Sequence, residues 1–191
     1  MSLDALKGDT IRKKGKYKSW YVVSLYFSDR TFRPIVTFRL CQSTRKSKFL
    51  GKFFHYYFRW LHKMACNRAG IDFPWKTKIG AGFTMTHGWG IVINGNSVIG
   101  KNVTLFNGVT LGQRDRINEY GERFTQYPTI EDEVWIGPHA VIVGGVTIGK
   151  GPRIAANAFV TESIPPYSTV AGNPAVIART NTRPDVHNPA P

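Results

Sequence analysis

From residue 79 an aliphatic residue returns at every sixth position, glycine often follows it, and the charge balance changes abruptly near residue 70. These three observations predict a mainly β fold, a left-handed parallel β-helix of hexapeptide repeats with an N-terminal α-helical cap. A period of six does not fit an α-helix, whereas three hexads of this kind close one triangular coil. The aliphatic position would point into the prism and glycine or asparagine would make the corners.

The first domain is predicted over residues 1–70 as a basic, aromatic-rich helical cap. This stretch holds 16 of the 26 Lys and Arg but 3 of the 12 Asp and Glu, a net charge of +13, whereas the rest of the chain carries +1. Helices are expected over residues 17–27 and 46–68, separated by Pro34, which cannot continue a helix. In the second helix, residues at helical spacing predict a core-facing stripe with the Lys and Arg on a solvated face: Phe49, Phe53, Tyr57 or Phe58, Leu61 and Met64.

Three interpretations of the basic cap compete. A nucleic-acid surface is not expected, since no known nucleic-acid motif accompanies the charge. Peripheral contact of residues 1–70 with an anionic membrane stays open, because basic amphipathic helices with Trp and Phe lie in headgroup regions. A plain cap with an aromatic core is the interpretation that we prefer.

The second domain is predicted over residues 71–179. Hexads run over 79–110 and 130–165, with a slip of two residues at 91–92 and an inserted polar loop over 113–129. Loops that leave a rigid solenoid are often functional. We expect a homotrimer to cover the flat aliphatic faces, the cap to cover one open end, and residues 180–191 to form a disordered tail.

The chain lacks the features of a secreted or membrane-spanning protein. The first 14 residues hold no apolar stretch, and no window reaches 18 apolar residues. We expect a cytoplasmic protein, peripheral at the inner membrane face if the cap binds lipid. Cys41 and Cys66 are too few for a disulfide framework or a four-thiolate zinc site.

Three segments carry a family resemblance: IDFPWKTKIGAGFTMTHGWGIVI over 71–93, NGVTLGQ over 107–113 and IPPYSTVAGNPAVIAR over 164–179. Together they resemble the hexapeptide-repeat acyltransferases, and among them the serine acetyltransferase-like branch. The resemblance implies an acetyl-CoA-dependent O-acetyltransferase that needs no metal. It also implies a catalytic histidine, His87, with Asp72 standing 15 residues before it, the spacing of the family's pair.

This pair suits the implied chemistry. A neutral imidazole can remove the proton of an attacking hydroxyl near neutral pH, and a carboxylate on its other nitrogen stabilises the imidazolium. A backbone amide near Gly112 is the candidate oxyanion donor. The alternative is that His87 is a structural residue of the corner whose hydrogen bonds are satisfied. The glycine-flanked HGWG turn favours a catalytic role.

By position in the family, the coenzyme groove lies between adjacent subunits and is lined by Gly112, Gly137, Pro138, Ala156, Thr161 and Arg179. Small residues let the pantetheine arm approach the backbone, and Arg179 could meet a phosphate. Glu162 departs from a lysine common in related sugar acetyltransferases. His139 is interpreted as a surface or coenzyme-proximal residue. A three-histidine zinc site on this fold would need more histidines in the coils.

The acceptor is predicted from the positions at which this chain differs from the serine acetyltransferase pattern. Thr86, Gln126 and Tyr127 stand where serine acetyltransferases carry charged residues, and uncharged side chains cannot hold both ends of a zwitterion. We therefore predict a saccharide hydroxyl, as in the acetyltransferases of capsule, colanic-acid or O-antigen synthesis. Serine O-acetyl transfer is the alternative. A xenobiotic acetyltransferase and a non-catalytic scaffold stay open as well.

Overall fold

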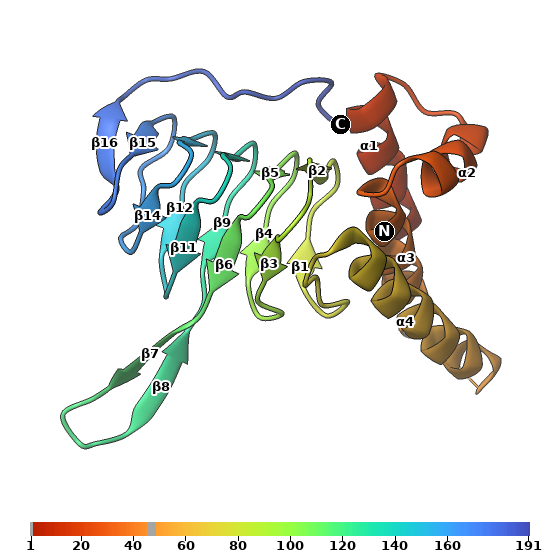
Figure 1. Cartoon of the computed structure of the whole chain (residues 1–191), viewed down its shortest axis with the longest axis horizontal. Helices are drawn as coiled ribbons and strands as arrows, with labels where there is room; N and C mark the ends of the chain where they lie inside the picture. Colours follow the sequence, from red (N-terminus) through yellow and green to blue (C-terminus); the bar gives the residue numbers. More distant parts are fainter. Residues whose placement is uncertain (1, 46–48) are drawn as a thin grey trace.

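The computed structural model describes residues 2–45 and 49–191, which form a bundle of helices at one end of a β-helix (Figure 1). The helices are α1 (Ser2–Lys14), α2 (Ser19–Ser28), α3 (Phe32–Thr44) and α4 (Phe49–Ala69). The third helix packs against the other three, which makes it the centre of the cap. Its buried side chains include Phe32, Ile35 and Phe38. The predicted helical cap over residues 1–70 is thus present, with a four-helix organisation.

The β-helix has three faces of stacked parallel strands. The first face consists of β1 (Lys78–Ile79), β4 (Val98–Ile99), β9 (Thr129–Ile130) and β12 (Thr147–Ile148). The second face consists of β2 (Thr84–Thr86), β5 (Thr104–Phe106), β10 (Trp135–Ile136), β13 (Arg153–Ile154) and β15 (Thr169–Ala171), with β16 (Val176–Arg179) added antiparallel. The third face consists of β3 (Val92–Ile93), β6 (Thr110–Gly112), β11 (Val141–Val143) and β14 (Phe159–Val160).

The six-residue period corresponds to columns of stacked aliphatic side chains. In the first face, Ile79 pairs with Ile99, Ile99 with Ile130, and Ile130 with Ile148, and all four side chains are buried. The other faces repeat the pattern with the columns Met85, Leu105, Ile136, Ile154 and Val170, and Ile93, Leu111, Ile142 and Val160. The repeat therefore arises because each coil must place an apolar side chain directly on the one below it.

The two predicted interruptions take defined shapes. The slip lengthens the corner after β2, so that His87, Gly88, Trp89 and Gly90 bulge from the coil before Ile91 turns back into the core. The insertion was expected as a polar loop and is a β-hairpin of β7 (Arg114–Ile117) and β8 (Arg123–Gln126) that projects away from the body (Figure 1). At its turn the Asn118 carboxamide oxygen accepts hydrogen bonds from the backbone N–H groups of Tyr120 and Glu122.

Pro34 does not act as the predicted helix breaker. It lies in the first turn of α3, where its missing N–H has no intrahelical partner to lose. The break between α2 and α3 comes from Asp29, whose Oδ1 accepts the backbone N–H groups of Thr31 at 2.8 Å and Phe32 at 3.0 Å. The helical arrangement thus follows a side-chain cap that the proline obscured.

The predicted core stripe of the last cap helix is wrong for Phe53, Met64 and the choice of Tyr57, whereas Leu61 and the alternative Phe58 lie on the buried side. Phe53 is 72% exposed, and Tyr57 and Met64 are also exposed. The buried side of α4 instead carries His62, Ala65, Cys66 and Ala69, with Phe58 and Leu61 half-buried beside them. Residues 46–48 and the side chain of Phe49 lie outside the described part of the chain. Helical spacing could not choose the face, because α4 is apolar on two sides.

The tail from Asn181 was expected to be disordered, and the structure places it against the body. It runs back along the β-helix to the cap (Figure 1). Asn102 receives a hydrogen bond from the N–H of Ala190 at 2.8 Å and donates one to its carbonyl at 3.1 Å. Arg153 pairs with Asp185 at 3.0 Å, and the Arg12 guanidinium donates to the His187 carbonyl. Polar partners in the coils and in α1 therefore hold the tail, whose sequence has no periodic pattern.

One buried ion pair joins the cap to the first coil. The Arg39 guanidinium, from α3, donates to the Asp9 carboxylate of α1 at 2.8 Å, and both side chains are at most 1% exposed. Arg39 also donates to the carbonyls of Ile79 and Gly80, while Asp9 accepts the backbone N–H of Phe83. Complete burial raises the pKa of the Asp9 carboxyl, and the charge and hydrogen bonds of Arg39 oppose that rise.

Replacing Asp9 with Ala should destabilise the protein by about 3–5 kcal/mol, because it leaves the Arg39 charge buried without a partner. Urea unfolding followed by circular dichroism measures the loss. The matched control is Asp4→Ala on the same helix, where the carboxylate is exposed and little change is expected. Equal effects of the two substitutions would contradict a bridging role for Asp9.

Candidate active site

The corner between the second and third faces forms a column of stacked residues that begins at His87. Thr86 pairs with Phe106, Leu105 with Ile136, and Ile136 with Ile154, so the same register places His87, Asn107, Pro138 and Ala156 one above another. The backbone N–H of His139 donates to the Asn107 carbonyl, and that of Asn157 to the Pro138 carbonyl. Gly137, Pro138 and Ala156, three of the residues predicted to contact coenzyme, therefore share this edge with the predicted base.

The cap fixes the His87 corner through Trp89. The Arg30 guanidinium lies 3.6 Å from the centroid of the Trp89 ring and donates to the Ala69 carbonyl at 2.8 Å. Gly70 has a positive φ of 65°, and a Cβ atom there would stand 2.6 Å from the indole. The Gly90 N–H in turn donates to the Gly70 carbonyl at 2.8 Å. The glycine that ends α4 is thus the surface against which the corner packs.

His87 itself is exposed and lies at the edge of a cavity of about 520 Å³. Its φ of +53° is left-handed, as at other corners of the coils such as Asn102, His139 and Asn157, so this conformation places the residue at a corner and does not by itself mark a functional site. Thr86 lines the same cavity beside it. The remaining lining residues belong to the cap: Lys13, Lys14, Leu25, Ser28, Asp29, Arg30 and Thr31.

This lining adds residues that the sequence did not indicate. Lys13, Lys14 and Arg30 come from α1 and the segment before α3, more than 50 positions before His87. Asp29 is engaged, since Lys13 binds its Oδ2 at 2.9 Å and Thr31 and Phe32 bind its Oδ1. Burial alone would raise the pKa of the Asp29 carboxyl, but the hydrogen bonds and charges of its partners lower it below its ordinary value. The surplus of cations favours an anionic group in this cavity.

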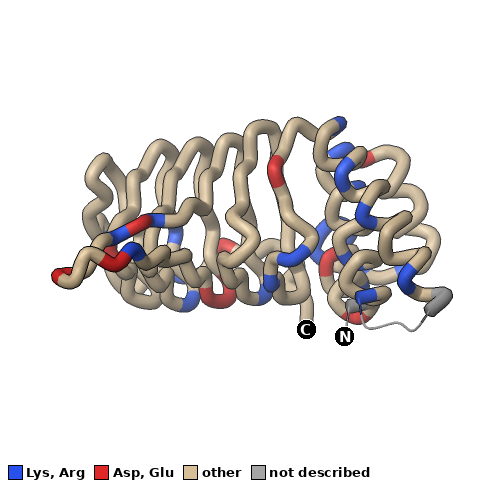
Figure 2. The backbone as a smooth tube through the Cα atoms, turned by 90° about the horizontal axis from the view of Figure 1, so that it is seen from below, with Lys and Arg blue, Asp and Glu red and all other residues tan. Residues whose placement is uncertain are grey.

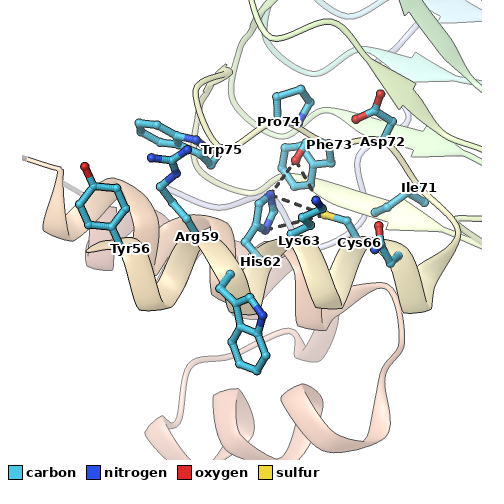
Figure 3. Close-up of a pocket in the computed structure, with 12 residues that line it drawn as sticks. Tyr56, Arg59, His62, Lys63, Cys66, Ile71, Asp72, Phe73, Pro74 and Trp75 are labelled. Atoms are coloured by element: carbon cyan, nitrogen blue, oxygen red, sulfur yellow. Dashed lines mark hydrogen bonds between the residues drawn. The ribbon is translucent and has the colours of Figure 1, made fainter. Parts of the chain in front are cut away.

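Asp72 lies apart from His87. Its backbone extends the third face by a bridge to Val92, and its exposed carboxylate borders a different cavity of about 590 Å³ between α4 and the first coil (Figure 3). In the part of the chain that the structure describes, no hydrogen bond joins Asp72 to His87. The catalytic pairing of these residues therefore stays a prediction.

The buried His62 and Cys66 beside this second cavity do not form a reactive pair. The ring nitrogens of His62 contact the Phe73 carbonyl at 2.6 Å and the Thr37 hydroxyl at 2.9 Å, and Cys66 lies 3.6 Å from the ring (Figure 3). Burial raises the pKa of the Cys66 thiol to about 12 and lowers the pKa of His62. A thiol in this environment stays protonated and is a packing residue.

The other predicted site residues lie at different edges of the molecule. Gly112 and Thr161 stand at the far edge of the third face, in register with Val143, and Thr161 lines a small cavity with Gln126 at the root of the hairpin. Tyr127 follows Gln126 directly. Arg179 pairs with Thr169 at the opposite edge of the second face. Within one chain, the His87 corner therefore lies at a different edge from the predicted acceptor residues Gln126 and Tyr127.

His139 is a surface residue at the His87 edge. Its Nε2 lies 3.1 Å from the Asn107 carboxamide nitrogen, and it covers Gly108, where a Cβ atom would meet the ring at 2.2 Å.

Among the described residues, no group of three or more His, Cys, Asp and Glu side chains is placed to hold a metal ion. Within the same residues, no helix is both long and apolar enough to cross a bilayer.

The coils and their corner site define the class: this is a hexapeptide-repeat transferase, and a profile described as "Bacterial transferase hexapeptide (six repeats)" matches residues 127–162. The Bacillus subtilis serine acetyltransferase is 33% identical over 164 residues, which cover 86% of this chain and 70% of that protein. The Bacillus licheniformis serine acetyltransferase is 41% identical over 112 residues, 59% of this chain and half of that protein. The chain therefore belongs to the serine acetyltransferase family.

Solved structures agree with this assignment. The serine acetyltransferase of Brucella abortus in complex with coenzyme A has a TM-score of 0.71 at 25% identity, covering 93% of this chain and 66% of that one. The Neisseria gonorrhoeae enzyme in complex with serine has a TM-score of 0.66 at 26% identity, covering 93% and 69%. The likeness spans the cap as well as the coils.

Substituting Gly70 with Ala should move Trp89 and with it the His87 corner. The new methyl group meets the indole and also carries the cost of a positive φ, about 1 kcal/mol. We expect a lower melting temperature and a change in tryptophan fluorescence. Gly121→Ala is the matched control, because Gly121 has a φ of +79° but nothing within 4 Å of a new Cβ atom. A fluorescence change of the same size in both variants would contradict the contact.

Proposed function

We propose that this protein is an acetyl-CoA-dependent O-acetyltransferase in which His87 is the general base. The observation that carries the proposal is the exposed His87 at the edge of a cavity, on the same edge as Gly137, Pro138 and Ala156. The family membership supports the same chemistry. Acetyl-CoA would supply the thioester, and the small corner residues leave room for an extended arm along the column.

The imidazole would take the proton of the acceptor hydroxyl while the oxygen forms a bond to the thioester carbonyl carbon. Collapse of that adduct breaks the carbon–sulfur bond, and the imidazolium returns its proton to the departing thiolate. His87 can act in this way because its side chain is exposed at the edge of the cavity. Asp72 stays the candidate carboxylate for the imidazolium, and an amide near Gly112 the candidate oxyanion donor.

A homotrimer would complete the site. The hairpin projects from the body (Figure 1), and Gln126 lies at its root beside Thr161, at the edge of the third face away from the His87 corner, with Tyr127 directly after it. Packing of one chain against the next would bring the hairpin edge of one subunit to the His87 edge of its neighbour. The half-buried outward side chains of the third face, Thr110, Val141 and Phe159, suit such a contact.

For the acceptor, L-serine takes precedence over the saccharide that the sequence predicted. The comparisons favour serine, because the relatives described above are serine acetyltransferases and one structure contains serine. Thr86, Gln126 and Tyr127 carry no charge. The cap would supply part of the missing charge, because Lys14 lines the cavity and would bind the serine carboxylate. A saccharide is the second candidate, since those three positions lack the charged side chains that serine acetyltransferases carry there.

Replacing His87 with Asn should lower kcat for acetyl-CoA turnover with the active acceptor by about 10²–10⁴-fold, the contribution of a general base. Thiol release from acetyl-CoA is followed with L-serine in one series and surface-polysaccharide precursors in another. His187→Asn, an exposed histidine of the C-terminal segment, is the control. Coenzyme A binding without transfer to either acceptor would favour the scaffold, and turnover that survives His87→Asn would refute the assignment of the base.

Lys14→Gln should raise the KM for L-serine by about 3–10-fold while kcat changes little, because a charge-assisted hydrogen bond to the serine carboxylate contributes about 1 kcal/mol or more. The matched control is Lys16→Gln, an exposed lysine two positions away that does not line the cavity. Steady-state kinetics at low ionic strength measure the difference. A KM that responds equally to both substitutions would indicate a general field effect and no contact.

A further inference from the structure

The outward side of α4 carries an apolar stripe that nothing in the described chain covers. We define the outer stripe as Phe53, Tyr56, Tyr57, Trp60 and Met64, which recur at helical spacing opposite the buried side of the helix. Phe53 is 72% exposed and Trp60 is 57% exposed. Tyr57 and Trp60 stack on each other with ring centroids 6.2 Å apart. Clustered apolar exposure of this kind marks an interaction surface.

Cations flank this stripe on the same helix. Lys52, Arg59, Lys63 and Arg68 are exposed, and the sequence of α4 contains no acidic residue. Figure 2 shows Lys and Arg distributed along the helices at this end of the molecule. A second exposed apolar stripe, Trp20, Val23 and Phe27, lies on α2, which also lacks acidic residues and follows Lys14, Lys16 and Lys18. The cap thus combines exposed aromatic side chains with a large positive charge.

We propose that the outer stripe docks the protein on the surface of an anionic phospholipid bilayer, with α4 lying in the headgroup region. The stripe runs from Phe53 to Met64, about 18 Å along the helix axis, and a helix lying in the headgroup region can bury all of it. Trp and Tyr prefer the membrane–water boundary, and the flanking Lys and Arg bind anionic headgroups. Contact across the surface agrees with the absence of a membrane-spanning helix among the described residues.

Charge decides between this occupant and a second copy of the chain. Two caps packed through α4 would bring the same cations face to face with no carboxylate from either helix to compensate them. Residues 1–70 carry a net charge of +13, so an anionic surface is the complementary partner. A single-stranded nucleic acid would satisfy the cations and its bases could stack on the aromatic rings, but no known nucleic-acid motif accompanies the charge, so the experiment below includes it as an outcome.

Docking on α4 would also bring the lipid surface to the cavity that contains Asp72. Arg59 lies between Tyr56 and Trp75, with its guanidinium carbon 5.6 Å and 5.1 Å from their ring centroids. Tyr56, Arg59 and Lys63 project from α4, and Asp72 and Trp75 follow from the first coil (Figure 3). The docking does not depend on the proposed acetyl transfer, and the experiment below needs no acceptor.

The full-length protein is sedimented with vesicles of phosphatidylcholine, with and without phosphatidylglycerol. We expect binding that requires phosphatidylglycerol and weakens with salt. The double variant Phe53→Ser/Tyr57→Ser should bind at least about tenfold more weakly. Lys52→Gln should bind about fivefold more weakly, the contribution of one cation near an anionic surface. The controls are Tyr120→Ser and Arg116→Gln on the exposed hairpin, which should bind as the unchanged protein does.

Circular dichroism tests whether each variant is folded. A second measurement needs no variant in which an apolar side chain is shortened to serine. Lipids brominated on their acyl chains should quench tryptophan fluorescence in the unchanged protein and quench it less in Trp60→Phe. Equal binding to both vesicle types, no binding, or equal losses in the hairpin variants would overturn the proposal. Self-association without lipid that the double variant abolishes would identify a second copy as the occupant, and binding to RNA or DNA in place of vesicles would identify a nucleic acid.

Discussion

The buried contact between Arg39 and Asp9 is the constraint on which the placement of the cap depends. A guanidinium removed from water must find acceptors for its donors, and here they come from α1 and from the first-coil carbonyls of Ile79 and Gly80. Helices α1 and α3 and the first coil therefore have one mutual arrangement that provides the buried guanidinium with its acceptors. Because a hydrophobic contact alone would allow sliding, the polar pair determines where the cap lies.

The cap is consequently part of the site as well as a cover for the end of the coils. Arg30 packs on Trp89, so the helical bundle supports the corner that presents His87. The same bundle contributes Lys13 and Lys14 to the cavity at His87. A shortened or displaced cap would thus change both the orientation of His87, the proposed base, and the charge in the cavity beside it, while the coils remain intact.

The coils could be predicted from the sequence because every hexad obeys one local rule, an inward aliphatic side chain stacked on the previous one. His87 could be predicted as the base because its HGWG turn and its spacing of 15 residues from Asp72 resemble the family's pattern, and that role stays a prediction. The direction of α4 could not be predicted, since Phe53 and Tyr57 have the same periodicity as a buried stripe. Nor could Lys14 be connected with His87, because no spacing rule relates a helix of the cap to a coil more than 70 residues later. Asp9 and Arg39 are likewise paired only by the packing of the cap.

The distribution of predicted site residues over one chain has a physical consequence for assembly. His87, Pro138 and Ala156 lie at one edge of the third face, whereas Gly112, Thr161 and Gln126 lie at the other. A rigid prism cannot fold to bring its own edges together, since each coil is locked to its neighbours by backbone hydrogen bonds. If all of these residues serve one reaction, a second chain must supply one of the two edges.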